Sequence, residues 1–268
     1  MADTLPPRIV DTHHHIYDPA IPPHPGTRPP PDAPLSAYTT LRARLGITHH
    51  VLIQPSSYGF DNALHLAARA EAPAISRVVA VLPPDTGAAE CRRMARAGVV
   101  GLRANLIHGV PLVPGDVPAL GRLCAGQGWH LQVFATADML AGMAPALRAL
   151  PCPLVLDHFA LLPPEGFADH PAWPVVSDLL GAGRAWVKLS SPYALPPGDP
   201  APLIRALAAV GPDRLLWGTN WPHPNTDLPQ DEGALREAAL APLSRAQRAS
   251  VLWDNPARLY GFAGSPEA

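Results

Sequence analysis

Three consecutive histidines near the amino terminus are the first residues of this chain whose types and spacing suggest chemistry. His13, His14 and His15 follow the apolar pair Ile9-Val10 and an Asp-Thr step. In an extended segment alternate side chains point to opposite faces, so His13 and His15 share one face and His14 packs behind it. Two imidazoles in one cavity can bind a metal, polarise a carbonyl group or transfer a proton. The alternative is a half-buried strand without a function.

Other polar side chains with chemical potential also follow short apolar runs. They are Ser56, Tyr58, Arg103, Gln132, His158, Lys188, Asn220 and His223, the last two in the polar run that ends at Asn225. A buried arginine needs an anion, so Arg103 is expected to bind a ligand carboxylate or to form an ion pair with Asp157 or Asp11. Lys188 is the only lysine, and it could bind substrate or pair with a neighbouring acid. Ser56 and Tyr58 could donate hydrogen bonds to a substrate or turn the chain.

Eight apolar runs could position these residues. The runs are continuous rather than alternating, as expected of parallel strands buried on both faces. We predict strands at residues 8–16, 51–54, 78–82, 99–105, 131–134, 154–156, 186–189 and 215–217. We predict helices at residues 36–45, 62–71, 88–97, 117–125, 139–150, 173–180 and 203–210, and from 234 onward. This alternation predicts an α/β fold, a single (β/α)8 TIM-type barrel over residues 1–268, with its chemistry at the carboxyl ends of the strands.

Composition limits the function further. A length of 268 residues with 47% hydrophobic residues suits one large domain. The net charge of -2 offers no basic face for nucleic acid. No signal peptide or long apolar run is visible, so we expect a cytoplasmic protein that binds no membrane. The three cysteines lack metal-binding spacing and are expected to be free thiols. The oligomeric state is left open.

The motifs at the predicted strand ends resemble the amidohydrolase superfamily, in its amidohydrolase-2 group. They are Asp-Thr-His-x-His at 11–15, Gln-Pro-Ser-x-Tyr at 54–58, Gly-Leu-Arg-x-Asn at 101–105, Leu-Asp-His-Phe at 156–159, Val-Lys-Leu-Ser at 187–190 and Trp-Gly-Thr-Asn-Trp-Pro-His-Pro at 217–224. The branch most similar to this chain is the one that holds 2-pyrone-4,6-dicarboxylate hydrolase and related lactonases. The resemblance extends over essentially the whole chain.

The resemblance implies a hydrolase that opens a carboxylated lactone or a similar ester without a metal or other cofactor. It assigns His13, His15 and His158 to holding and polarising the scissile carbonyl group. It assigns Arg103 to a substrate carboxylate, and the residue at position 220 to the attacking water. Ser56, Tyr58, Gln132, Lys188 and His223 are the further candidates for substrate binding.

Two departures from the family pattern matter. Asn220 stands where the family usually has aspartate, and an amide cannot accept a proton at neutral pH. The proton acceptor is then expected among His13, His15, His158, His223 and Asp227, while Asn220 could orient the water. The pyrone hydrolases also carry further arginines where this chain has residues 106–109 and 192–194, so a monocarboxylate is expected to be preferred over a dicarboxylate.

Two other functions stay open. One is a metal-dependent decarboxylase of the same superfamily, with a divalent ion such as zinc on His13, His15 and His158. That ligand set contains no anion, and strand five offers Gln132 where metal-dependent relatives usually have a ligand. The other is a catalytically impaired carboxylate binder, which the missing aspartate would explain. The metal content of the purified protein distinguishes the decarboxylase from a lactone hydrolase. Turnover of lactones distinguishes the impaired carboxylate binder from a lactone hydrolase.

Overall fold

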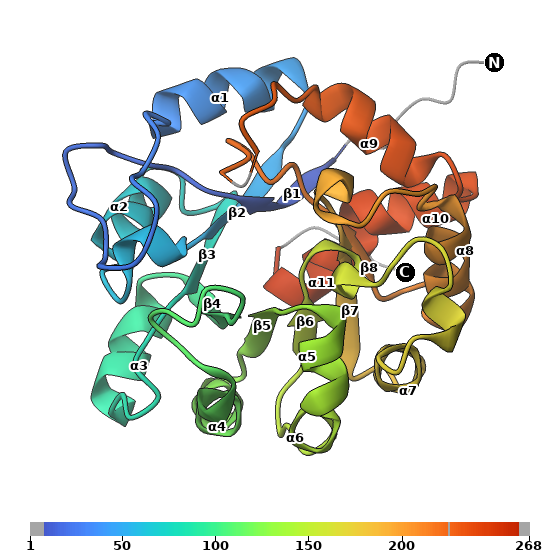
Figure 1. Cartoon of the computed structure of the whole chain (residues 1–268). Coiled ribbons are helices and arrows are strands. Elements are labelled where there is room, and N and C mark those ends of the chain that lie inside the picture. Colours follow the sequence, from blue (N-terminus) through green and yellow to red (C-terminus); the bar gives the residue numbers. More distant parts are fainter. Residues whose placement is uncertain (1–7, 225, 263–268) are drawn as a thin grey trace.

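A sheet of eight parallel strands forms the centre of the computed structural model, which describes residues 8–224 and 226–262 (Figure 1). Each strand pairs with the next one in the sequence. The strands are β1 Val10–His14, β2 His49–Ile53, β3 Ser76–Ala80, β4 Val99–Asn105, β5 His130–Phe134, β6 Leu154–Leu156, β7 Ala185–Leu189 and β8 Leu215–Trp217. The predicted (β/α)8 TIM-type barrel is thereby confirmed. Asn225, at the end of the polar run after β8, lies outside the described residues.

Helices surround the strands, as Figure 1 shows. They are α1 Leu35–Arg44, α2 Ala63–Glu71, α3 Ala88–Arg96, α4 Val117–Gln127, α5 Ala137–Gly142, α6 Ala144–Arg148, α7 Trp173–Gly181, α8 Ala201–Val210, α9 Glu232–Leu240, α10 Arg245–Ala249 and α11 Asn255–Tyr260. The single helix predicted at 139–150 is therefore wrong. Pro145 lies in the first turn of α6, and proline cannot continue a preceding helix because it lacks the N–H and clashes with the carbonyl four residues back.

The segment after β8 closes the barrel against β1. The Asp11 carboxylate accepts hydrogen bonds from the backbone N–H (2.9 Å) and the hydroxyl (2.6 Å) of Thr219. The next backbone N–H, that of Asn220, donates to the His13 carbonyl oxygen at 2.6 Å. Gly218 allows this approach, since a Cβ there would lie 2.7 Å from the backbone nitrogen of His13. These contacts hold Asn220 beside the histidines of β1.

The amino-terminal end of the barrel is filled by apolar and aromatic side chains. Trp253, Tyr260 and Phe262 belong to the same buried cluster as the valines of β1, β2, β3 and β6. His49, at the start of β2, packs against Trp253 and Phe262 with ring centroids 4.9 Å apart in both pairs, so it has a structural role. The polar opening is therefore at the carboxyl ends of the strands. None of the helices within the described ranges is long and apolar enough to cross a membrane.

Candidate active site

A pocket of about 180 Å³ opens at the carboxyl ends of the strands. Five predicted site residues line it: His15, Ser56, Arg103, His158 and Asn220. They come from β1, β2, β4, β6 and β8 or from the residues directly after them, so the folded barrel brings distant parts of the chain to one cavity. Of the described residues that line the pocket, none is acidic.

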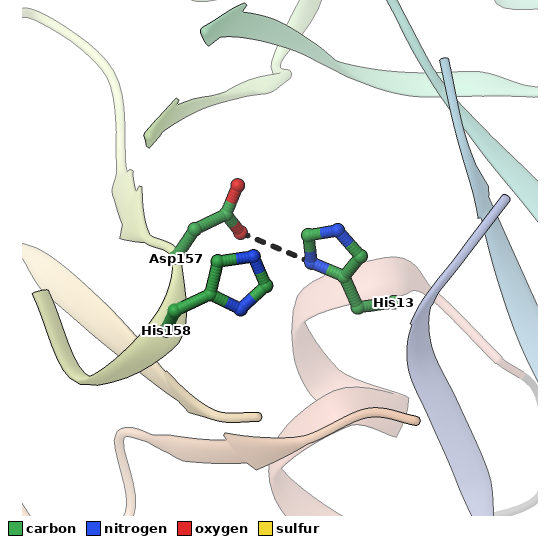
Figure 2. A group of neighbouring side chains, drawn as sticks. All are labelled: His13, Asp157 and His158. Carbon is green, nitrogen blue, oxygen red and sulfur yellow. Dashed lines mark ion pairs between the residues drawn. The ribbon is translucent and has the colours of Figure 1, made fainter. Parts of the chain in front are cut away.

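His13, Asp157 and His158 form a buried cluster beside this pocket (Figure 2). The His13 Nδ1 atom lies 3.2 Å from Asp157 Oδ1, and the rings of His13 and His158 have centroids 4.8 Å apart. Figure 2 shows the two rings side by side, with the carboxylate reaching His13. Burial lowers the pKa of His13 well below its usual range. A neutral His13 donates through Nδ1 to the carboxylate, and its other nitrogen has no partner among the described residues.

Asp157 is the centre of a buried charge network. Its Oδ2 atom accepts hydrogen bonds from Arg103 Nε at 3.2 Å and from Gln132 Nε2 at 3.0 Å, while Lys188 Nζ lies 3.6 Å from Oδ1. Burial alone would raise the pKa of Asp157, but the contact with His13 and the charges of Lys188 and Arg103 outweigh burial and hold it well below its usual range. Asp157 is therefore an anion at neutral pH.

Gln132 and Lys188 lie beneath the pocket, and neither lines it. The Lys188 ammonium group donates to Gln132 Oε1 at 2.7 Å and to the Thr12 carbonyl oxygen at 2.8 Å. Burial lowers the pKa of Lys188 to about 8, so the side chain is mainly protonated at pH 7. The two residues hold Asp157 in place, and Arg103 both pairs with Asp157 and reaches the pocket.

His15 has a fixed tautomer. Its Nδ1 atom lies 2.7 Å from the Ile53 carbonyl oxygen, which can only accept a hydrogen bond. The hydrogen is therefore on Nδ1, and Nε2 carries a lone pair. Burial, followed by the charge of Arg103, lowers the pKa of His15 well below its usual range, so the ring is neutral at pH 7. A neutral imidazole with a free lone pair at a pocket can accept a proton.

His158 begins a strained turn after β6. The residues from His158 to Leu161 all have positive φ angles, between 46° and 58°, although none is glycine. Such backbone is costly and is concentrated at functional sites. The His158 Nδ1 atom lies 2.8 Å from the Ser190 hydroxyl, which fixes the ring at the pocket wall. Burial lowers the pKa of His158 to about 4, so this histidine is also neutral at pH 7.

Asn220 also has a left-handed backbone, with φ of 60°. Its Nδ2 group donates to the Tyr193 hydroxyl at 2.9 Å, and that hydroxyl is 2.8 Å from His223 Nδ1. His223 lines an outer hollow beside the pocket rather than the pocket itself, and the exposed Asp227 lines the same hollow. The Tyr58 hydroxyl binds the backbone of Asp18 and does not line the pocket.

Sequence reasoning missed the contribution of two loops. Tyr17, Thr27 and Arg28, on the loop between β1 and α1, line the pocket, and so does His108 after β4. Loops as long as the one from Tyr17 to α1 are often functional, which was the only available signal. Arg28 adds a second arginine to the pocket where Arg103 alone was predicted.

The residues of the buried cluster could hold a metal ion by their types and spacing. Ligand atoms of His13, Asp157 and His158 lie within 4.8 Å of one another. The charges around them fit a divalent cation poorly, because Arg103 and Lys188 already neutralise Asp157 and Lys188 Nζ lies 3.4 Å from His13 Nδ1. A metal ion would have to displace these contacts.

Comparisons with known proteins found one matching family model and several relatives of similar length. A family model described as Amidohydrolase matches residues 10–262. The 4-sulfomuconolactone hydrolase of Hydrogenophaga intermedia is 32% identical over 96% of this chain and 90% of its own. The 2-pyrone-4,6-dicarboxylate hydrolase of Comamonas testosteroni is 30% identical over 96% of this chain and 91% of its own. The D-galactarolactone isomerase of Agrobacterium fabrum is 28% identical over 96% of this chain and 92% of its own.

Proposed function

Because the chain belongs to the amidohydrolase family, we propose that it is a hydrolase that opens the ring of a small carboxylated lactone. Relatives that are hydrolases of lactones or pyrones, and that match nearly the whole chain, support this reaction class. The observation that carries the proposal is the pocket, where a neutral proton acceptor, His15, lies with His158 and Arg103 around one small cavity.

The charge of the pocket supports an acidic substrate. Arg28 and Arg103 line the pocket, and no acid of the described chain lines it with them. Asp157 is bonded to Arg103 through Nε, which leaves the terminal nitrogens of the guanidinium group for a ligand. A planar guanidinium binds a carboxylate through two parallel hydrogen bonds. Arg28 is exposed on the rim and contributes attraction at longer range.

The proposed reaction uses residues of this chain alone. Water attacks the lactone carbonyl carbon, and its proton passes to Nε2 of His15. The carbonyl oxygen becomes an oxyanion, which His158 and Arg103 stabilise by hydrogen bonding and charge. When the intermediate collapses, the bond between the acyl carbon and the ring oxygen breaks. The leaving alkoxide takes the proton back from His15, and the product is a hydroxy acid.

The same observations support a reaction without a resident metal, since the cationic network around Asp157 leaves little place for one. The free, buried cysteines Cys91, Cys124 and Cys152 support a reducing compartment such as the cytoplasm. The net charge of -2 supports a small-molecule partner rather than nucleic acid.

A lactone isomerase is the second candidate, and Asn220 favours it. In an isomerase a hydroxyl group of the substrate would replace water as the nucleophile, so one lactone would become another. Such a nucleophile is already held by the rest of the substrate and depends less on a strong base than water does. Asn220 provides no carboxylate base, and one relative is a D-galactarolactone isomerase.

A panel of lactones tests the proposal. The protein should release ring-opened acid from lactones that carry a carboxylate and not from their uncharged esters. Changing His15→Gln should lower kcat by roughly 10²–10⁴-fold, the usual contribution of a general base. Formation of an isomeric lactone would favour the second candidate. Lack of turnover with every acidic lactone would contradict both.

A further inference from the structure

A chain of hydrogen bonds runs from the pocket to the buried carboxylate of Glu232 at the start of α9. Asn220 Nδ2 is 2.9 Å from the Tyr193 hydroxyl, which is 2.8 Å from His223 Nδ1. The other ring nitrogen of His223, Nε2, is 3.4 Å from Glu232 Oε1. The second oxygen of Glu232 accepts from Arg44 at 3.0 Å. The side chains of His223 and Glu232 are 7% and 8% exposed, so water competes little for these bonds.

The chain has a direction because Glu232 can only accept. Glu232 is the first residue of α9, where the helix dipole favours an anion. Burial opposes its charge, but the hydrogen bond from His223 and the charge of Arg44 hold the pKa of Glu232 below its usual range. An ionised Glu232 requires a hydrogen on Nε2 of His223. In a neutral ring Nδ1 then carries a lone pair.

The direction passes through Tyr193 to Asn220. Burial raises the pKa of Tyr193, so the phenol keeps its single hydrogen. That hydrogen points to the lone pair of His223, which leaves the phenol oxygen as an acceptor. Of the two ends of the Asn220 amide, only the NH2 group can donate to that oxygen. Since the two ends of an amide lie on opposite sides of one carbon, the carbonyl oxygen of Asn220 must then turn away from Tyr193.

We propose that Tyr193, His223 and Glu232 are positioning residues that hold the Asn220 amide with its carbonyl oxygen toward the pocket. In this orientation the amide oxygen of Asn220 accepts a hydrogen bond from the attacking hydroxyl group. A lone pair of that hydroxyl oxygen is then directed at the substrate. In the opposite orientation the NH2 group of Asn220 would donate a hydrogen bond to the lone pair of the attacking hydroxyl oxygen. The inference rests on the proposed function for its effect on rate, but the amide orientation itself is a property of the free protein.

A pair of backgrounds tests the proposal. In the protein with Asn220, Tyr193→Phe should lower kcat about tenfold, the effect of one lost hydrogen bond, with little change in KM. In the Asn220→Ala background there is no amide to orient, so Tyr193→Phe should change kcat less than twofold. Glu232→Gln should behave like Tyr193→Phe. The carboxamide of glutamine can also donate, so it no longer requires a hydrogen on Nε2 of His223. An equal loss in both backgrounds would overturn the proposal.

Tyr58→Phe is the matched control, since its hydroxyl binds only the backbone of Asp18. Any decrease in kcat that Tyr58→Phe causes should be the same in both backgrounds.

A measurement without substrate separates this inference from the proposed reaction. The side-chain amide signals of Asn220 in a 15N spectrum are assigned by their loss in Asn220→Asp. Both proton signals should shift in Tyr193→Phe and in Glu232→Gln, and stay in place in Tyr58→Phe. Unchanged signals in Tyr193→Phe would overturn the inference even if the enzyme hydrolyses lactones. Shifted signals without lactone turnover would contradict the proposed function and leave the orienting chain standing.

Discussion

Replacing Asp157 by asparagine should destabilise the protein strongly. The change keeps the size of the side chain but removes the anion between Arg103 and Lys188, whose side chains are 4% and 0% exposed. Breaking a buried ion pair by removing one partner leaves an uncompensated charge and typically costs about 3–5 kcal/mol. Lys188 limits the cost by releasing its proton, because burial already lowers its pKa to about 8. Arg103 has no such escape, so we expect a loss of about 3–5 kcal/mol at pH 7.

Urea unfolding of the two proteins measures this loss, provided that the slope of the transition is unchanged. Asp178→Asn is the control, because it removes the same charge from an exposed pair with Arg148 and should cost less than about 1 kcal/mol. The pKa of Asp157 is depressed by folding, so its contribution is present above the ordinary carboxyl pKa and is lost as the pH falls through the folded value. The difference between the proteins should therefore shrink below about pH 4. A loss under about 1 kcal/mol at pH 7 would refute the charge network.

Three further outcomes are expected of the pocket. Burial lowers the pKa of His158 to about 4 and that of His15 well below its usual range, so kcat/KM should stay flat from pH 7 to about pH 5. A fall through about pH 6.5 would show histidines with ordinary pKa values instead. Arg103→Met should weaken binding of an acidic lactone by about 2–5 kcal/mol. Arg28→Met should weaken it by at most about 1 kcal/mol, with a larger effect at low salt. Equal effects of the two changes would contradict the different burial of the two arginines. Dialysis against a chelator should leave activity unchanged and the metal content well below one ion per chain, and restoration of activity by zinc would favour a metal-dependent enzyme.

The regular parts of the barrel were predictable because burial determines them. The predicted bounds of β4, β6 and β8 agree with the structure. β6 and β8 are continuous apolar runs, and β4 is buried over most of its length although it contains Gly101 and Arg103. The side chains at the carboxyl ends of the eight strands had to meet at one opening, which placed His15, Arg103 and His158 together. The contacts of His14, which lies 2.9 Å from His50 and stacks on Tyr38, also follow from alternation along a strand.

The depth of a side chain was harder to predict than its face. Lys188 and Gln132 both precede the end of their strands, so they lie below the opening and bind Asp157 there. Arg103 also precedes the end of its strand, but its longer side chain reaches the pocket as well as Asp157. Strand periodicity does not distinguish these cases, because the depth of a side chain also depends on its length and on the register between neighbouring strands.

Loop geometry could not be predicted at all. Arg28 comes to the pocket from a loop without regular periodicity. The contact between Tyr193 and His223 joins residues 30 positions apart on two different loops. Local propensity carries no information on such contacts, since they are set by how the loops after β7 and β8 pack against each other.

Hydrolysis of an acidic lactone in water enriched in oxygen-18 tests the central claim most directly. Attack of water on the carbonyl carbon, assisted by His15, predicts a hydroxy acid with one heavy oxygen in its new carboxylate and none in its hydroxyl group. His15→Gln should lower the rate of this labelling in parallel with turnover. An isomeric lactone without heavy oxygen, or label in the hydroxyl group alone, would contradict the proposed hydrolysis.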